Sequence, residues 1–467
     1  MTISRRAFLS ASAALTLAPA FAARAWAAPL PREADIVVIG AGAAGIAAAR
    51  RVVGAGRKVI VLEASGQIGG RCATDTTTFD TPFDRGARWL HTPDTNVLVK
   101  LARGAGIDVA PAPPSQKLRI GRRNARAGET EDLLATLVRA NRAIDDGARR
   151  GDISCAALLP KDLGDWGGTI DFLLGAYATG KDLKDLSALD QFRAQDRAID
   201  VATKQGLGTL MAKLGEGIPV ALSTPATRVS WSGRDIGVET AAGRIAARGV
   251  ILTVSSNVLA SGAIKFTPEL PKRQLDAAAK LSLGSYDRIA LQFAGNPLGL
   301  GRDELMIEQS ANARTAALFA NIGGTSLCTL DVAGAFGRDL SAQGEAAMSA
   351  FAVEWLTKLF GSDIAKAVKK SSATRWNAAP FVQGAMSAAA PGGQASRRVL
   401  TEPMGNLFIA GEATHETLWG TVDGAWDSGE RAAEAALARL APLKQAEPMK
   451  PARPAKRRSR SSGIGAE

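Results

Sequence analysis

Three glycines and one glutamate near the start of the chain have the spacing of a phosphate-binding turn. Gly40, Gly42 and Gly45 follow the β-branched run 35–39, and Glu63 ends the next apolar run. In such a triplet the first glycine makes the turn, the second admits a pyrophosphate, and the third lets helix and strand pack closely. The new helix offers unpaired N–H groups to a phosphate. A carboxylate at Glu63 could accept two ribose hydroxyls and would repel a 2′-phosphate, so the pattern predicts binding of a dinucleotide other than NADP.

Further motifs at both ends of the chain suit a longer dinucleotide. Gly69-Gly70-Arg71 sets a fixed cation beside a glycine pair, and the loop 83–91 follows it. Near the other end, the apolar run 406–410 leads into Gly411-Glu412, and 421–425 opens an Ala-rich helix. The N-terminus of that helix would favour negative charge developing on a reduced ring. The chain therefore supplies two separate clamps for one cofactor.

These motifs resemble those of the flavin monoamine oxidase and polyamine oxidase family, in outline over residues 34–440 and weakly between 101 and 205. The resemblance implies an α/β fold: a Rossmann-type FAD-binding domain, as in two-dinucleotide-binding-domain flavoproteins, with an α+β substrate domain. By resemblance, Val229 would contact the adenine side and Glu412 the ribityl–phosphate region. The full set of expected FAD contacts is Gly40, Gly42, Ala44, Gly45, Glu63, Ala64, Gly70, Arg71, Gly86, Ala87, Arg88, Trp89, Val229, Gly411, Glu412, Thr421, Val422 and Ala425.

The order of the motifs predicts domains built from separate pieces. Residues 34–100, 206–262 and 395–440 would form the FAD-binding domain, because strand-like runs in the second and third pieces return to the cofactor. Residues 101–205 and 263–394 would form the substrate domain.

Several positions depart from the family pattern where the flavin would meet its substrate. Ala385 stands where the mammalian monoamine oxidases have the flavin-linking cysteine, so FAD would be held without a covalent bond. Met386 and Thr421 stand where those enzymes place the two tyrosines of an aromatic cage, which orients an amine. Trp89 and Trp419 are the aromatic residues that could replace that cage.

Two arginines complete the candidate chemistry. Arg288 stands where the family commonly has a lysine near flavin N5, and it would be a permanent cation there. With Trp89, Met386 and Thr421 it makes up the set of candidate catalytic positions. Arg88, beside the flavin loop, could hold a substrate carboxylate, although a structural salt bridge is the reading we favour from sequence.

Composition limits the other kinds of site. Two histidines and three scattered cysteines among 467 residues argue against a structural metal site and give no disulfide framework. The net charge of +12 comes largely from the two ends. Residues 441–467 form a basic Pro/Ala/Lys/Arg/Ser-rich tail without apolar periodicity, which predicts disorder; no nucleic acid partner is expected.

The N-terminus reads as an export signal. Arg5-Arg6 precedes a short, mildly apolar run and a small-x-small cleavage pattern, so residues 1–27 predict a twin-arginine signal peptide. The run is shorter than the ~20 residues of a membrane span, which argues against a permanent anchor. This signal predicts contact with the twin-arginine export machinery and a folded, cofactor-loaded protein in the periplasm.

The leading functional prediction is an FAD-dependent amine oxidase or dehydrogenase. A small amine would lose hydride to flavin N5, the imine would hydrolyse, and electrons would pass to oxygen, giving hydrogen peroxide, or to a periplasmic carrier protein. One alternative keeps the flavin but oxidises an amino acid or desaturates a C–C bond. Another, prompted by the altered cage, is an exported flavoprotein that does no catalysis and assists assembly of a partner.

Overall fold

The computed structural model describes residues 30–440, except 114, 115, 196 and 198. The predicted signal peptide and basic tail therefore lie outside the described residues. Within the described part, no helix has both the length and the apolar character needed to cross a membrane.

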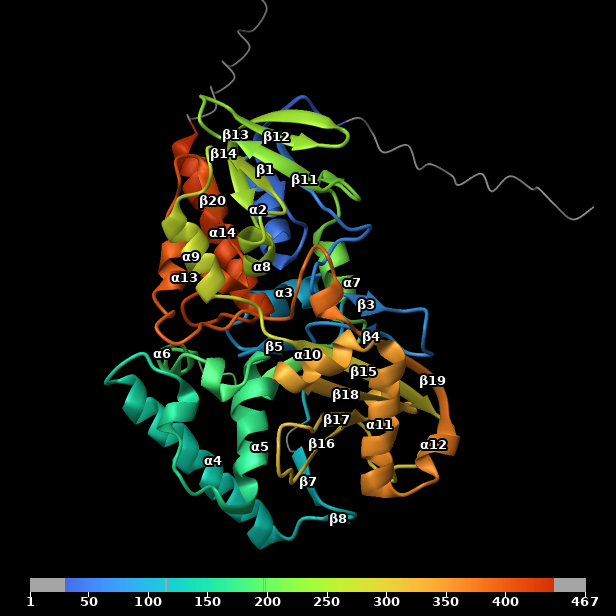
Figure 1. The fold of residues 1–467 in the computed structure, drawn as a ribbon. Coiled ribbons are helices and arrows are strands. Elements are labelled where there is room, and N and C mark those ends of the chain that lie inside the picture. The colour runs from blue at the N-terminus through green and yellow to red at the C-terminus, as the bar shows by residue number, and fades with distance from the viewer. Residues whose placement is uncertain (1–29, 114–115, 196, 198, 441–467) are drawn as a thin grey trace, which may run out of the picture.

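An eight-stranded sheet forms the centre of one half of the molecule (Figure 1). Strands β10, β2, β1, β13 and β20 are linked by parallel pairing, while β12 pairs antiparallel with β13 and β11. The β-branched residues of β1 are buried because helices cover both faces of the sheet. The strands are β1 (Glu33–Ile39), β2 (Val59–Leu62), β10 (Val220–Ala221), β11 (Ala226–Ser230), β12 (Ile236–Thr240), β13 (Gly243–Leu252), β14 (Lys265–Thr267) and β20 (Leu407–Ile409).

Alternate residues of the central strands pack into two separate cores. Ile36 and Val38 face α2 and α14, whereas Val37 and Ile39 face the other group of helices. Helices α2 and α14 approach so closely that a Cβ at Gly429 would lie 2.1 Å from the carbonyl oxygen of Ala44. The first group is α2 (Ala43–Gly54), α3 (Val97–Gly104), α7 (Leu207–Leu214) and α14 (Val422–Arg439), and the second is α8 (Ser256–Ala260), α9 (Lys272–Lys280) and α13 (Ser396–Thr401).

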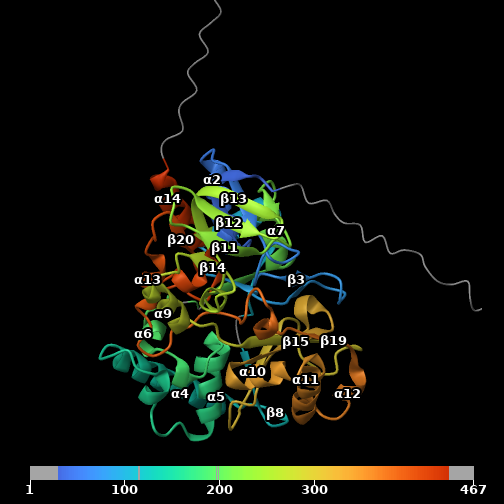
Figure 2. The same ribbon diagram turned by 45° about the horizontal axis from the view of Figure 1, so that its top comes forward.

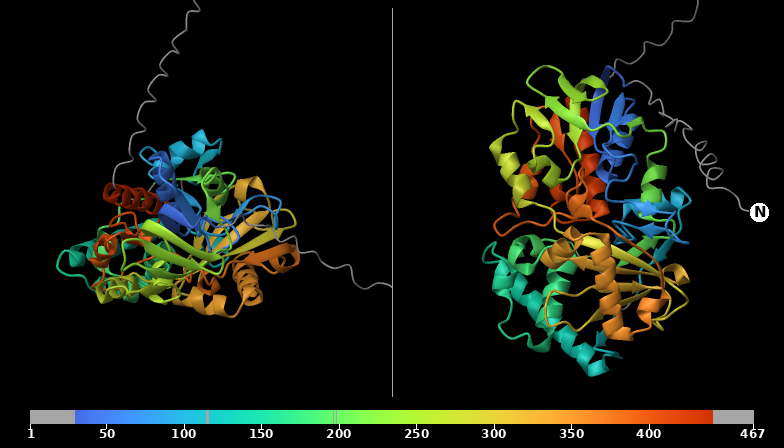
Figure 3. Two further views of the ribbon diagram at one scale, coloured as in Figure 1. Left: turned by 90° about the horizontal axis from the view of Figure 1, so that it is seen from above. Right: turned by 45° about the vertical axis from the view of Figure 1, so that its right-hand side comes forward.

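A seven-stranded sheet in the order β19-β15-β18-β17-β16-β7-β8 forms the other half. Helices α10 and α11 cover its apolar face, while α4, α5 and α6 lie at the side (Figures 1 and 2). Figure 3 shows the two halves stacked end to end in the side view. The elements are β7 (Gln116–Ile120), β8 (Arg123–Asn124), β15 (Tyr286–Phe293), β16 (Glu304–Glu308), β17 (Ala317–Ala320), β18 (Leu327–Ala333), β19 (Val368–Ala373), α4 (Ala127–Ala148), α5 (Gly167–Asp171), α6 (Ala188–Phe192), α10 (Gly334–Ala342), α11 (Glu345–Phe360) and α12 (Ile364–Ala367).

Short elements join the halves. Two small sheets contain β3 (Thr74–Asp75) with β4 (Phe83–Asp84), and β5 (Trp89–His91) with β9 (Asp200–Thr203) and β6 (Val109–Pro111). The single-turn helices are η1 (Cys155–Leu158), η2 (Gly164–Trp166), η4 (Leu183–Asp185), η5 (Ile322–Gly324), η6 (Trp376–Ala378) and η7 (Glu412–Thr414), and η3 (Phe172–Tyr177) is a π-helix.

The predicted fold class is confirmed, but the predicted domain boundaries need correction. Strand β14 pairs with β11 in the first sheet, and α9 packs into the same core, so the boundary expected at 262 falls too early. Ile107 and Val201, predicted to belong to the substrate domain, are buried in the core of the first half. Local sequence pattern misplaced these segments because their partners are distant in sequence.

Candidate active site

The first glycine turn has the shape of a phosphate cradle. Gly40 adopts φ +108°, and a Cβ at Gly45 would lie 1.9 Å from the Gly40 carbonyl oxygen, so a side chain there would collide with the turn. Helix α2 begins after Gly42 without a side-chain cap, and Ala44 lies in its first turn. The first N–H groups of a helix have no partner within the helix. They suit an anion such as a pyrophosphate.

Glu63 lies beside this turn, where β2 ends. Its side chain is buried; Oε2 accepts a hydrogen bond from Ala41 N at 2.7 Å and Oε1 accepts one from Ser65 N at 2.8 Å. Ala64 connects the two residues. The carboxylate therefore braces the glycine turn, and its remaining lone pairs are those that a ribose hydroxyl would use.

The second glycine motif packs directly on the first. Gly69 N donates to the Ala41 carbonyl at 2.9 Å. Gly70 has φ +58°, and a Cβ on it would lie 3.3 Å from Gly42 Cα. The two turns predicted separately from the sequence thus form one surface.

Arg71 connects that surface to the C-terminal motif. Its Nη1 lies 2.7 Å from Glu412 Oε1 and 2.7 Å from the Ala385 carbonyl oxygen. The Arg71 side chain is still 27% exposed, so it keeps donors free for a phosphate. Arg71 therefore joins the two predicted clamps.

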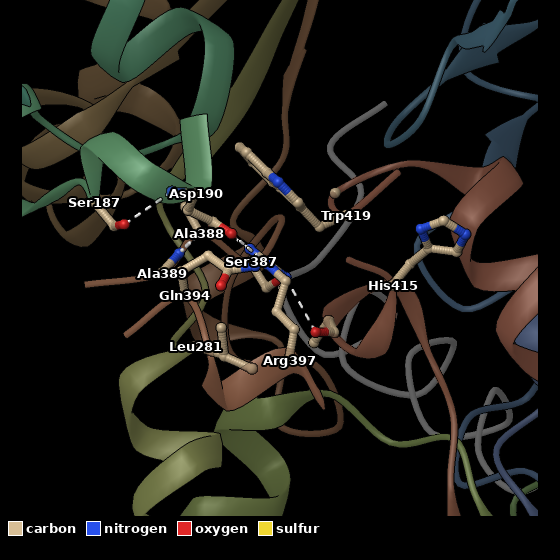
Figure 4. A network of polar contacts seen from close by, with 12 residues as sticks. Ser187, Asp190, Leu281, Ser387, Ala388, Ala389, Gln394, Arg397, His415 and Trp419 are labelled. Carbon is tan, nitrogen blue, oxygen red and sulfur yellow. Dashed lines mark hydrogen bonds and ion pairs between the residues drawn. The ribbon is translucent and has the colours of Figure 1, made fainter. Parts of the chain in front are cut away.

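Glu412 accepts several hydrogen bonds in a buried polar network, and Figure 4 shows the neighbouring part of this network around Ser387, Arg397 and Asp190. Ser387 donates to Glu412 from both its backbone N and its hydroxyl, and Gly420 N donates at 2.8 Å. Burial alone would raise the pKa of Glu412, but the charge of Arg71 and these donors hold it below the ordinary value. Arg397 contacts the Ser387 hydroxyl and makes a two-pronged ion pair with Asp190, at 2.6 Å for each hydrogen bond. The network therefore ties α13 of the first half to α6 of the second.

Arg288 holds the predicted flavin loop, residues 83–91, through hydrogen bonds to its backbone. Its Nε donates to Asp331 Oδ1 at 2.7 Å, and its Nη1 donates to the carbonyls of Asp84 at 2.5 Å and Gly86 at 2.8 Å. Burial opposes its charge, but Asp331 outweighs burial and raises the pKa of Arg288 further. These contacts give Arg288 a structural task; the expected role near flavin N5 stays a prediction.

Arg88 does not form the structural salt bridge that the sequence favours. Its side chain is buried, yet no described carboxylate lies within 4 Å of its guanidinium. Its one hydrogen bond to a described residue runs from Nη2 to Thr329 Oγ1 at 2.8 Å. The guanidinium carbon lies 4.6 Å from the ring centre of Phe319 and 5.7 Å from that of Trp89. The salt-bridge reading was wrong because the nearby carboxylates are bound elsewhere.

Comparison with known proteins agrees with this arrangement. The model of the flavin-containing amine oxidoreductase family matches residues 43–437. The chain belongs to this family. Membership implies a flavin cofactor.

Individual relatives are distant. Human lysine-specific histone demethylase 2 is 27% identical over 454 residues, which cover 85% of this chain and 53% of that protein, so the chain spans about half of the demethylase's length. Polyamine oxidase 5 of Oryza sativa subsp. japonica is 27% identical over 436 residues, with 86% and 87% covered. The structure of cyclohexylamine oxidase from Brevibacterium oxydans IH-35A has a TM-score of 0.74 at 20% identity and covers 87% of this chain and 99% of its own. At that identity the likeness shows the fold.

Met386 and Thr421, the two expected cage positions, lie close together. A Cβ at Gly420 would lie 3.6 Å from the Cβ of Met386. The neighbouring Thr421 caps α14: its hydroxyl accepts from Gly424 N at 2.9 Å and donates to the Leu418 carbonyl at 2.7 Å. Val422 and Ala425 follow in the first turn of that helix. Thr421 is thus held by the backbone as a helix cap.

Of the two aromatic substitutes, one is placed differently from expectation. Trp419 is enclosed, with the guanidinium carbons of Arg197 and Arg397 at 4.9 and 4.8 Å from its ring centre. Its ring therefore has no free face for an amine, so that expectation was wrong. Trp89 remains partly exposed, 5.9 Å from the ring of Phe319.

The remaining expected FAD contacts differ in how accessible they are to a ligand. Gly86 and Ala87 lie against Arg71, since Ala87 N donates to its carbonyl at 3.1 Å. Gly411 has φ +138° with open space around its α-carbon, which suits close approach of a ligand. Val229 has no exposed surface in the core around β11, so only its main chain could reach an adenine.

Sequence reasoning missed several residues of the site. Asp331 is the single charge in the apolar strand β18, a pattern that could have signalled a buried ion pair with Arg288. Tyr177 and Tyr286 are the two tyrosines of the whole chain, and their ring centres lie 6.1 Å apart. No local pattern distinguishes Ser387, because its importance comes from Glu412.

Proposed function

We propose that the chain is an FAD-dependent oxidase or dehydrogenase of a small amine. The observation that carries this proposal is the junction at Arg71, where the two nucleotide clamps meet beside the cage positions. FAD, when bound, would accept a hydride from the carbon next to the amine nitrogen and pass the electrons to oxygen or to a carrier protein. The resulting iminium would take up water and release ammonium and a carbonyl compound.

The protein's own part in this chemistry is binding and orientation. The open first turn of α2 and the exposed donors of Arg71 suit the pyrophosphate, and Glu63 holds the turn in shape. The N-terminus of α14, capped by Thr421, favours negative charge on a nearby ring. A neutral amine that gives up hydride needs no strong base, so positioning is the main requirement.

The test is anaerobic mixing of the purified yellow protein with a panel of amines and amino acids. Bleaching of the oxidised flavin absorbance by at least one of them is the expected result. A flavin that none of them reduces would favour the role of a non-catalytic assembly partner instead.

We infer that the FAD is held without a covalent bond. Ala385 has only a methyl side chain, and its carbonyl accepts from Arg71, so the position offers no nucleophile to the ring. Acid precipitation should release the yellow cofactor into the supernatant. Colour that stays in the pellet would contradict this.

We also propose export through the twin-arginine route to the periplasm, from Arg5-Arg6 and the short apolar run after it. Replacing both arginines with lysine keeps the charge but removes the paired guanidinium groups, and should leave the protein in the cytoplasm. Equal periplasmic recovery of both forms would refute the proposal.

A further inference from the structure

We propose that the amine substrate carries a carboxylate and that Arg88 binds it. This inference rests on the proposed function, since it names the substrate class of the same site. It makes Arg88 the residue that selects amino-acid-like substrates over simple amines and polyamines.

Arg88 is a buried cation with no described carboxylate in direct contact, although Asp331 and Asp84 act on its charge from further away. Its side chain is 8% exposed. Asp331, the acid on the adjoining strand, already accepts from Arg288 and from the Tyr286 hydroxyl at 2.8 Å. Asp84 accepts instead from the Thr74 hydroxyl and from a backbone N–H. The protein therefore leaves the Arg88 guanidinium without a carboxylate hydrogen-bonded to it.

This arrangement has an electrostatic cost. Burial, with the positive charge of Arg288, lowers the pKa of Arg88 to about 10. The group stays charged at neutral pH, and buried charges are ordinarily paired. Asp331 and Asp84 offset this effect only in part. A ligand carboxylate beside Arg88 would supply a direct ion pair, so the bound state of an anionic substrate is favoured.

The geometry around Arg88 also suits a carboxylate. Thr329 holds one end of the guanidinium by a hydrogen bond, and the rings of Phe319 and Trp89 lie within cation–π distance. Phe319 on β17 pairs with Thr329 on the neighbouring strand β18. Thr329 lies two residues before Asp331, so it shares the sheet face that carries Asp331 and its partner Arg288. The guanidinium of Arg88 is thus held against a rigid sheet. Its other N–H groups remain for the paired hydrogen bonds that arginine makes with a carboxylate.

The two tyrosines, Tyr177 and Tyr286, also lie near Arg88. Tyr177, at the end of the π-helix η3, feels the charges of Asp331 and Arg88, and burial raises its pKa to about 12. Its hydroxyl makes no hydrogen bond with the described residues, whereas that of Tyr286 is bound to Asp331. Single π-turns occur frequently at functional sites. Tyr177 therefore offers a neutral donor beside Arg88.

Other buried cations disfavour a polycationic substrate. Lys181 donates to the Ser282 hydroxyl and the Ala388 carbonyl, and Arg197 donates to the Trp419 carbonyl; no described carboxylate lies within 4 Å of either. Burial, together with Arg397, lowers the pKa of Lys181 to about 8 and that of Arg197 to about 10. Nearby acids, Asp190 among them, offset these cations only in part, so further positive charge from a polyamine is disfavoured here.

The experiment compares L-phenylalanine with 2-phenylethylamine, and L-lysine with cadaverine, as anaerobic reductants of the holoprotein. Within each pair the molecules differ by one carboxylate. We expect the wild type to be reduced at lower concentrations of the amino acid. Arg88→Met should raise the half-saturating amino acid concentration about 10- to 100-fold, as for loss of a charge-assisted hydrogen bond. The half-saturating concentration of the amine should rise less than that of the amino acid.

The matched control is Arg85→Met, which removes a half-exposed arginine from the same loop and should behave as wild type. A readout without turnover is binding of 3-phenylpropanoate, measured by calorimetry. The wild type and the Arg85→Met variant should bind it, and Arg88→Met should not. Should Arg88→Met lose its FAD, Arg88→Lys keeps the charge without the planar fork and should show a smaller loss.

The outcomes separate the two proposals. If no amine or amino acid reduces the flavin, the proposed function fails, while Arg88-dependent binding of 3-phenylpropanoate would leave the anion site standing. If simple amines reduce the flavin and amino acids do not, or if Arg88→Met and wild type bind the carboxylate equally, the substrate class proposed here is wrong.

Discussion

Replacement of Arg397 by methionine should destabilise the protein more than any surface change. Both members of the Arg397–Asp190 pair have side chains with no exposed surface, and both hydrogen bonds between them measure 2.6 Å. Without Arg397, Asp190 would keep only the bond from Ala389 N at 3.0 Å. The change leaves a carboxylate buried and uncompensated.

Breaking a buried pair by removing one partner costs about 3–5 kcal/mol. Unfolding about 400 residues at about 2.1 cal/mol/K per residue gives an entropy of about 0.85 kcal/mol/K, so this loss lowers Tm by about 4–6 °C. Replacing both members, as Arg397→Met with Asp190→Leu, removes the stranded charge. The double variant should therefore recover at least half of that loss, because apolar replacement of a buried pair is often neutral.

The assay is thermal unfolding at one fixed FAD concentration, since bound cofactor itself raises Tm. The control is Arg398→Met, on the same short helix, because Arg398 is exposed and its Tm should change by less than about 1 °C. A Tm for Arg397→Met equal to that of this control would refute the reasoning. So would a double variant no more stable than Arg397→Met alone.

Three further predictions address the cofactor and its loop. Glu63→Ala should weaken FAD retention, because the turn loses its brace and the ribose loses a charged acceptor worth about 1.5–3 kcal/mol; unchanged FAD affinity would remove Glu63 from the site. Arg288→Met should lower both Tm and FAD retention, because two loop carbonyls lose their donor and Asp331 loses its cation; wild-type values for both would rule out bracing. Asp84→Asn should raise Tm at pH 7.5 and leave it unchanged below pH 4. Burial raises the pKa of Asp84 to about 6, so its ionisation costs stability as the pH rises from about 4 through 6; equal Tm values at pH 7.5 would contradict this.

The nucleotide half could be predicted from sequence because its signals are local. A β-branched run, a glycine triplet and an acid at the end of the next run lie close together in the chain, and each follows from a backbone requirement such as the positive φ of Gly40. The strand predicted at 35–39 corresponds to β1. Boundaries failed where pairing is distant, as for β14, whose partner β11 lies across the β12–β13 hairpin.

The candidate site was harder to predict because much of it depends on which charges meet. The sequence shows Arg71, Arg88, Arg288 and Arg397 as four equivalent cations. In the fold, three of them have carboxylate partners, in Glu412, Asp331 and Asp190, and the fourth has none. Only the sheet register that sets Arg288 opposite Asp331 makes that acid unavailable to Arg88.

That distribution of charge also bears on why the altered cage need not mean a lost function. An aromatic cage in front of a flavin orients an amine by its cationic or nitrogen end. A fixed arginine orients an amino acid by its other end, through two parallel hydrogen bonds, and this leaves the nitrogen free to point at the ring. Met386 and Thr421 then need only leave room, which an unbranched thioether and a hydroxyl already bound to the Leu418 carbonyl can do. With the amino-acid substrate that we propose, both the absence of the two tyrosines and the buried Arg88 without a direct carboxylate partner follow from one change in substrate.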